Sequence, residues 1–177
     1  PEGLTVKILD FDETDLSAAN AMLLIAKLKP QGMIDLAYLE LMALTEVQIT
    51  ALPEGLSVKG LSLYETDILA ANAMLLIAKL KPQGNLILDY VDLSGLTEEQ
   101  INTIPDELSV KGLSLNRTNI SAKNAMLLID KLKPQGILNL EYVDLSALTE
   151  EQRNALPEGL TVKILDFDET DLSATNT

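Results

Sequence analysis

The 177-residue chain contains no cysteine, no histidine and no tryptophan. Without cysteine it forms no disulfide and has no thiolate nucleophile, and without histidine it lacks an imidazole base and the usual zinc ligands. Acid–base chemistry by paired carboxylates stays open on residue types alone, yet none of the carboxylates lies in a unique, non-repeating segment. We therefore expect the protein not to be an enzyme and to need no cofactor.

Basic residues are scarce as well. Lysine and arginine number 13 against 27 aspartates and glutamates, so the formal net charge is −14. Nucleic acids and anionic membrane surfaces attract clusters of basic residues, so both are poor candidate partners, and a basic protein, a cation or solubility alone fits the charge better. No apolar run reaches the ~20 residues of a membrane-spanning helix, which predicts no membrane insertion. The missing cysteines leave the compartment open.

A 52-residue repeat organises the chain, and each unit starts at a proline: Pro1, Pro53, Pro105 and Pro157. Residues 18–32 are identical to residues 70–84, and residues 1–18 are identical to residues 157–174. We interpret residues 1–177 as one repeat domain with units 1–52, 53–104 and 105–156 and a partial unit 157–177. Because the chain opens and closes within a repeat, we expect it to be a fragment of a longer array.

Each unit contains two related half-units, A and B, with the shared pattern L-x-L-x-x-(T/V)-x-(L/I). The A copies start at Leu9, Leu61, Leu113 and Leu165, and the B copies start at Ile34, Leu86 and Leu138. Apolar and polar residues alternate at the start of each copy, which is typical of a short strand. Successive starts lie alternately 25 and 27 residues apart, enough for a helical crossover between parallel strands. The pattern predicts seven parallel strands.

A helix is expected after each strand. In the first A half-unit, Ser17 is expected to cap a helix whose apolar face is formed by Ala21, Leu24, Ile25 and Leu28. The B half-units carry a capping-box pattern that predicts shorter helices after Thr45, Thr97 and Thr149.

These half-units resemble leucine-rich repeats, L-x-x-L-x-L-x-x-N/C-x-L, and their alternation resembles the ribonuclease-inhibitor-like subgroup. The resemblance covers essentially the whole chain and implies an α/β solenoid with a curved parallel sheet inside and helices outside. Threonine takes the Asn/Cys position of the A half-units, where a small polar side chain bonds the loop backbone: Thr14, Thr66, Thr118 and Thr170. The B half-units depart from the family pattern there, with Leu39, Val91 and Val143.

The competing architecture is an all-helical solenoid of the HEAT or TPR kind. It would need a second long amphipathic helix in each half-period. The tyrosine, the valine and the alternation in segments such as residues 138–143 argue against such a helix. The two architectures differ in whether residues 61–63 and 86–88 are paired neighbours.

The polar positions of the strands are expected to project from the inner face of the sheet. They vary between units while the leucines do not, as expected for a binding solenoid. The candidate binding residues are Asp10, Asp12, Asp35, Tyr64, Asp89, Asn116, Asn139, Glu141, Asp166 and Asp168. The alternative is a solvated sheet face that is acidic without binding anything.

Carboxylates are dense at Asp10, Asp12, Glu13 and Asp15, and the same cluster recurs at residues 166–171. Calcium prefers such oxygen ligands, but the EF-hand pattern is absent and alternation sends neighbouring side chains in different directions. We interpret the cluster as a solvated charge run and expect no metal site.

The leading functional hypothesis is a scaffold for protein–protein interaction that binds a partner protein, itself basic, through the inner sheet face. The alternative is a structural, self-assembling segment or a designed repeat array with no ligand of its own. Apolar residues such as Leu9 and Phe11 lie at the end of the array. Exposed strand edges and apolar layers there predict end-to-end self-association.

Overall fold

The computed structural model describes residues 6–11, 14–156 and 161–163, which form an α/β structure of short parallel strands alternating with helices. The described strands are β1 (Ile8–Asp10), β2 (Met33–Asp35), β3 (Gly60–Ser62), β4 (Asn85–Ile87), β5 (Gly112–Ser114), β6 (Ile137–Asn139) and β7 (Thr161–Lys163). The described helices are α1 (Ala18–Leu28), α2 (Glu46–Thr50), α3 (Ala70–Leu80), α4 (Glu98–Ile101), α5 (Ala122–Leu132) and α6 (Glu150–Asn154).

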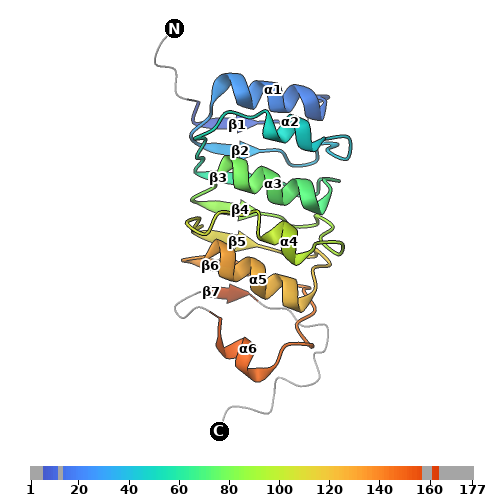
Figure 1. The fold of residues 1–177 in the computed structure, drawn as a ribbon, viewed down its shortest axis with the longest axis vertical. Coiled ribbons are helices and arrows are strands. Elements are labelled where there is room, and N and C mark those ends of the chain that lie inside the picture. The colour runs from blue at the N-terminus through green and yellow to red at the C-terminus, as the bar shows by residue number, and fades with distance from the viewer. Residues whose placement is uncertain (1–5, 12–13, 157–160, 164–177) are drawn as a thin grey trace.

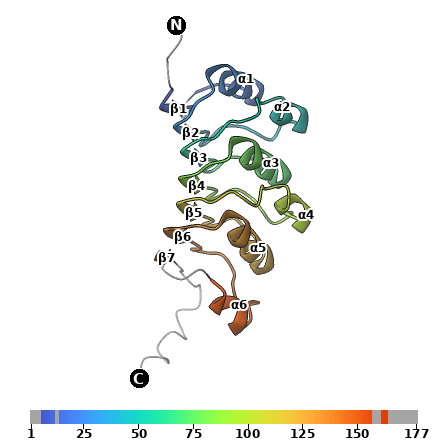
Figure 2. The same ribbon diagram turned by 60° about the vertical axis from the view of Figure 1, so that its left-hand side comes forward.

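The seven strands form one open, all-parallel sheet in chain order. Figures 1 and 2 show the strands stacked along the length of the molecule, with the helices covering one face of the sheet. Leu61 of β3 lies opposite Leu86 of β4, so the A and B half-units are paired neighbours as predicted. This pairing excludes the all-helical alternative.

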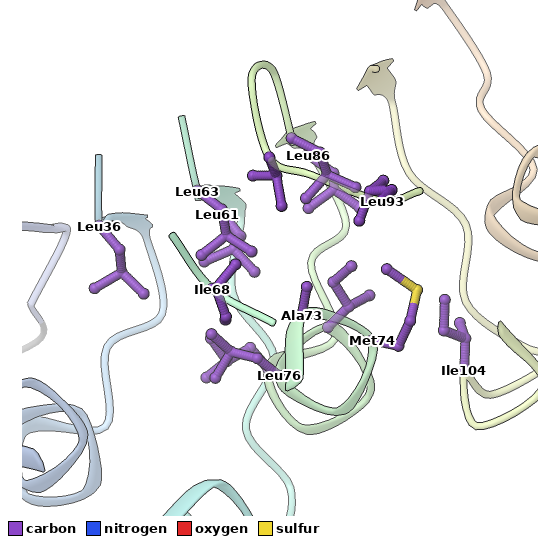
Figure 3. Packing of buried hydrophobic residues seen from close by; sticks show 14 of the residues in the cluster. Leu36, Leu61, Leu63, Ile68, Ala73, Met74, Leu76, Leu86, Leu93 and Ile104 are labelled. Carbon is purple, nitrogen blue, oxygen red and sulfur yellow. The ribbon is translucent and has the colours of Figure 1, made fainter. Parts of the chain in front are cut away.

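Burial of the strand leucines holds this sheet together, because strands of three residues have little stability of their own. Leu61, Leu63 and Leu86 are fully buried in the same cluster as Ala73 and Met74 of α3, as Figure 3 shows. Each buried leucine contributes roughly 1.5–3 kcal/mol. Successive units therefore share one continuous core.

The helix ends follow the predicted capping chemistry. The Ser17 Oγ accepts a hydrogen bond from the Asn20 N–H at 3.4 Å, and α1 ends at Lys29, whose φ of 45° is left-handed. Pro30 disfavours the helical conformation at the preceding residue, so the helix cannot continue. The predicted capping boxes form as well, between Thr45 and Gln48, Thr97 and Gln100, and Thr149 and Gln152.

The turn after each strand also follows the prediction. The Thr66 Oγ1 donates a hydrogen bond to the Leu63 carbonyl at 3.0 Å, and Thr14 and Thr118 form the corresponding bonds. Thr170 lies outside the described residues. In the B half-units a buried apolar side chain takes this place, and the backbone bond from the Val91 N–H to the Leu88 carbonyl, at 3.0 Å, closes the turn.

The predicted apolar face of the first A helix is only partly buried. Ala21 and Ile25 are buried in α1, whereas Leu24 and Leu28 remain 36% and 40% exposed. No described element packs on the outer side of β1 and α1. The helical pattern therefore placed these leucines on one face of α1 but did not show that part of this face lacks a neighbour.

The prediction that the last strand begins at Leu165 is wrong. β7 lies three residues earlier, and Val162 pairs with Leu138 of β6. All three residues of β7 are exposed, Val162 included, at 36%. The local sequence does not explain the shift, because Ile8 directly precedes Leu9 in the identical N-terminal segment and the predicted register forms there.

This shift changes the predicted row of polar residues at its end. Lys163 lies opposite Asn139, where Asp166 was expected. Asp166 lies outside the described residues, and the row ends on a basic residue rather than an acidic one.

Candidate protein-binding surface

The face of the sheet opposite the helices carries the polar strand positions, and we call it the open face. The register places one residue of each strand side by side across β1 to β6, five of them polar and one, Ile87, apolar: Asp10, Asp35, Ser62, Ile87, Ser114 and Asn139. Ser62 is buried, and the others are exposed or half-buried. Asp10 and Asp35 therefore lie on adjacent strands, and Asn139 lies in the same row four strands further along the sheet.

Side chains of the open face also organise the turns that follow the strands. The Asp35 Oδ1 accepts a hydrogen bond from the Ala37 N–H at 3.0 Å, and the Asn139 Oδ1 accepts one from the Glu141 N–H at 3.1 Å. Such bonds tie the strand end to the residue two positions later. The predicted residues Asp35 and Asn139 therefore have a structural role besides any contact with a partner.

The second predicted row lies just beyond the strand ends. Tyr64, Asp89, Asn116 and Glu141 are half-buried there. The Asp89 Oδ1 accepts a hydrogen bond from the Asn116 N–H at 3.2 Å, which links two neighbouring half-units. Asp12 and Asp168, the remaining members of this row in the prediction, lie outside the described residues.

A ladder of stacked side chains runs along this edge of the sheet. We call it the tyrosine ladder, and its members are Tyr38, Tyr64, Tyr90, Arg117 and Tyr142. The ring centroids of Tyr38 and Tyr64 are 5.4 Å apart and those of Tyr64 and Tyr90 are 5.3 Å apart, both in edge-to-face geometry. The Arg117 guanidinium lies 5.7 Å from the Tyr90 ring centroid and 4.1 Å from that of Tyr142.

The backbone of the turns positions this ladder. Tyr38, Glu65, Tyr90, Arg117 and Tyr142 occupy equivalent places in successive half-units, and each has a positive φ between 53° and 64°. The left-handed conformation is uncommon for residues other than glycine. Its recurrence at five successive turns aligns these side chains in one row, beside the half-buried row of Tyr64 and its equivalents.

Aromatic rings and charged side chains alternate along this row. Tyr38 and Tyr90 are 57% and 41% exposed, and Glu65 between them in the row is exposed. Partial burial, followed by the neighbouring Tyr38 and Tyr90, raises the pKa of Tyr64. Exposed aromatic faces beside carboxylates are suited to binding cations.

The charge of Asp89 is the least well solvated on this edge. Burial raises the pKa of Asp89, and the Glu141 charge acts in the same direction. The Asn116 N–H acts against this shift because it donates a hydrogen bond to the Asp89 carboxylate. A cation placed near Asp89 and Glu141 would offset both the desolvation of the Asp89 carboxylate and its repulsion by the Glu141 charge.

A hollow of about 770 Å³ adjoins the first tyrosine of the ladder. Tyr38, Glu40 and Asp67 line one side of it, and residues 14–19 line the other. The Asp67 carboxylate accepts hydrogen bonds from the N–H groups of Leu41 and Met42, which holds this wall in place. The ladder and the hollow together form a continuous candidate surface with three carboxylates at one end, those of Asp15, Glu40 and Asp67.

Sequence reasoning selected Tyr64 but missed the rest of the ladder. Tyr38, Tyr90 and Tyr142 recur exactly one repeat apart, a signal that was present in the sequence. The alternating pattern of each B strand ends at the residue before each of these tyrosines, so the strand pattern alone does not select them. The contact with Arg117 has no sequence signal, since it depends on the conformation of the turn.

Within the described ranges no three acidic side chains gather closely enough to hold a metal ion. In the same part of the chain, no helix has the length and apolar character needed to cross a membrane. Comparison with protein-family models, with curated proteins and with solved structures found no match to this chain.

Proposed function

We propose that the chain is a leucine-rich-repeat scaffold that binds a basic protein partner through the tyrosine ladder and the carboxylates beside it, those of Asp35, Asp89 and Glu141. The repeat type is supported by one short parallel strand per half-unit and by the threonine bonds that close the A turns. The protein does not act as an enzyme in this proposal, because the surface presents rings and carboxylates without an activated nucleophile or base.

One observation carries the proposal: the ladder already holds a cation. Arg117 lies over the rings of both Tyr90 and Tyr142. Glu65 stands at the equivalent place one unit earlier, next to Tyr64. An arginine or lysine of the partner would find exposed rings and a counter-charge there, in the environment that the chain itself provides for Arg117.

The proposal is tested with a poly-arginine peptide, with poly-glutamate as the negative probe. The open-face variant combines Asp35→Lys, Asp89→Lys and Glu141→Lys, and fluorescence anisotropy measures the binding. Loss of complementary charge is expected to weaken poly-arginine binding at least about tenfold. Circular dichroism checks that the variant is folded. If it is not, the single variant Glu65→Lys replaces it in the binding measurement.

A matched control separates a site from general attraction to an acidic protein. Glu46→Lys, Glu99→Lys and Glu151→Lys make the same change in net charge on the exposed surfaces of α2, α4 and α6. This control is expected to bind poly-arginine nearly as well as the wild type. If both triple variants weaken binding equally, the partner senses net charge only and the proposed surface is wrong.

The alternative function, a structural or designed array with no ligand, is supported by the near identity of the units. It predicts that neither probe binds and that ladder variants have no effect. Tyr38→Ala and Tyr90→Ala distinguish the two functions, because they remove exposed rings without changing the charge.

A further inference from the structure

The two long edges of the sheet differ in charge. We call them the amino edge, where the strands begin, and the carboxyl edge, where they end. Figure 1 shows the strands lying across the long axis of the molecule, so both edges run along its length. The carboxyl edge holds the tyrosine ladder and, at the strand ends and in the turns, these acidic residues: Asp35, Glu40, Glu65, Asp67, Asp89, Asp92, Glu141 and Asp144.

Lysines line the amino edge. Lys7, Lys59 and Lys111 directly precede β1, β3 and β5. All three are exposed, and among the described residues no acidic side chain forms an ion pair with them. Glycine takes this place in the B half-units, where a Cβ at Gly84 would lie 1.9 Å from the Lys59 carbonyl oxygen. The lysines therefore occupy every second strand.

The long helices bring further lysines to the same edge. The Val58 N–H donates a hydrogen bond to the Leu80 carbonyl at 3.1 Å, so the carboxyl end of α3 lies beside the start of β3. α5 ends beside the start of β5 in the same way. A lysine follows the last residue of each long helix: Lys29, Lys81 and Lys133.

Acidic residues offset only part of this positive charge. In the second unit, Lys59, Lys79 and Lys81 share the amino edge with Glu54, which forms an ion pair with Lys79. In the third unit the same three lysines recur one repeat later, beside Asp106 and Glu107, and Asp106 pairs with the equivalent of Lys79. The amino edge thus remains positive in both units, while the carboxyl edge is negative.

The two edges also share one period. Both sets repeat every 52 residues, with lysine on the amino edge and tyrosine on the carboxyl edge: Lys7, Lys59 and Lys111, and Tyr38, Tyr90 and Tyr142. Each set recurs on every second strand, a spacing of about 9.5 Å. When one edge is placed against the other, each lysine meets a ring, and no mismatch accumulates along the contact.

We infer that copies of this chain associate side by side, with the amino edge of one copy on the tyrosine ladder of its neighbour. The inference rests on the proposed function and identifies its basic partner as a second copy of the chain. The lysines take places like that of Arg117 over the rings of Tyr90 and Tyr142, and the carboxylates of the ladder edge supply the counter-charge. The contact runs along the sheet and involves neither end of the chain.

This contact is heterologous, because it joins two different surfaces. Each associated copy keeps one unoccupied edge, so association continues beyond the dimer. The net charge of −14 opposes association mainly at long range, since salt screens charges more than about 8 Å apart at physiological ionic strength.

Sedimentation velocity of the full chain, in about 0.15 M and about 1 M salt, tests this inference. Species that grow with protein concentration are expected at the lower salt, with association at least about tenfold weaker at the higher salt. A wild type that stays monomeric at the lower salt would overturn the inference, as would one that forms only a closed dimer.

An exchange of charges tests the pairing of the two edges. The amino-edge variant combines Lys7→Glu, Lys59→Glu and Lys111→Glu, and its partner in the test is the open-face variant described above. Each variant alone is expected to associate at least about tenfold more weakly than the wild type. An equimolar mixture is expected to associate again, because the intact edge of one variant fits the intact edge of the other.

A mixture that associates no more than the separate variants would overturn the inference. Circular dichroism establishes that each variant is folded, and Glu65→Lys replaces the open-face variant if that variant is not. The matched control combines Lys123→Glu, Arg153→Glu and Lys163→Glu, which make the same change in net charge on α5, α6 and β7. It should associate like the wild type, and a loss equal to that of the amino-edge variant would show an effect of net charge only.

A distance measurement identifies the edges in contact. The chain has no cysteine, so Gln83→Cys labels the amino edge with a spin label, and Gly95→Cys labels the loop after Tyr90, where an added Cβ meets no atom within 4 Å. A short distance between position 83 of one copy and position 95 of another is expected. A short distance between position 83 of two copies would show a two-fold contact and overturn the inference.

Poly-arginine binding separates this inference from the proposed function. A wild type that binds poly-arginine but does not associate with itself would overturn the inference and leave the proposed function standing. A wild type that does neither would overturn both.

Discussion

At the scale of single residues, the turns after the strands combine backbone strain with an exposed surface. Tyr90 has a φ of 64° and Arg117 a φ of 56°, values that cost roughly 1 kcal/mol or more for residues with a Cβ. A glycine would remove this strain. The larger side chains at these positions form the tyrosine ladder instead, which is consistent with selection for a surface rather than for stability alone.

Two aspartates near this edge are expected to affect stability with opposite signs. Burial raises the pKa of Asp89 above its ordinary value of 3.8, so the folded state binds this proton more tightly than the unfolded state does. Stability is then lost as the pH rises through the pKa of the folded state. We expect Asp89→Asn to be more stable than the wild type at pH 7, by less than about 1 kcal/mol because solvent screens this half-exposed group.

The comparison residue for this prediction is Asp144. Hydrogen bonds from the Ser146 hydroxyl and N–H lower the pKa of Asp144, so its contribution is present at neutral pH and is lost as the pH falls through the lowered pKa. Asp144→Asn should therefore be less stable than the wild type at pH 7. Urea unfolding at neutral and acidic pH measures both variants, and shifts of the same sign would contradict the assignment.

At the scale of elements, the repeating element is a strand, a turn and a helix, which together are not stable in isolation. The long helices have good caps at Ser17 and Ser121, whereas α3 begins after Leu69, which provides no side-chain hydrogen bond. α3 is nevertheless the most completely buried of the three. Packing against the neighbouring half-units therefore outweighs the missing cap, which is typically worth about 1 kcal/mol.

The two identical helices allow a direct test of this packing. Asn72→Ala leaves the buried Leu44 carbonyl without its donor and is expected to cost roughly 1–3 kcal/mol. Asn20→Ala makes the same change in the same local sequence, where the side chain is exposed, and should have almost no effect in dilute solution. Thermal unfolding measures the loss of stability in each variant. An equal loss would show that helix propensity, rather than the hydrogen bond to Leu44, causes the destabilisation.

At the scale of the whole molecule, each half-unit is stabilised by its neighbours through the sheet and the shared core. An interior strand has a neighbour on both sides, whereas β1 has one among the described residues. The ends of such an array are therefore expected to open before the middle does.

Leucine truncation measures this difference between the middle and the end. Leu86 of β4 is fully buried, and Leu86→Ala is expected to cost about 2–5 kcal/mol through loss of burial and the cavity left behind. Leu9 occupies the equivalent strand position in β1 but is only partly buried. Leu9→Ala should cost clearly less in urea unfolding, and equal costs would argue against fraying from this end.

Much of the fold follows from the sequence alone. The 52-residue period and the alternation around Leu61 and Leu86 predicted the strands, their parallel order and their register up to β6. The role of Thr66 in its turn was implied by the resemblance to leucine-rich repeats, in which a small polar side chain at this position bonds the loop backbone. These features are local or strictly periodic, and so they can be seen in the order of residues.

The tertiary structure decided the rest, because identical segments take different environments. Residues 1–18 and 157–174 have one sequence, yet Leu9 pairs across the sheet as predicted while Val162 takes the corresponding place in β7. Leu24 and Leu76 differ only in what lies beside them. The strand register at an end of the sheet and the burial of a helix face are set by contacts with neighbouring elements. These contacts cannot be read from the local sequence.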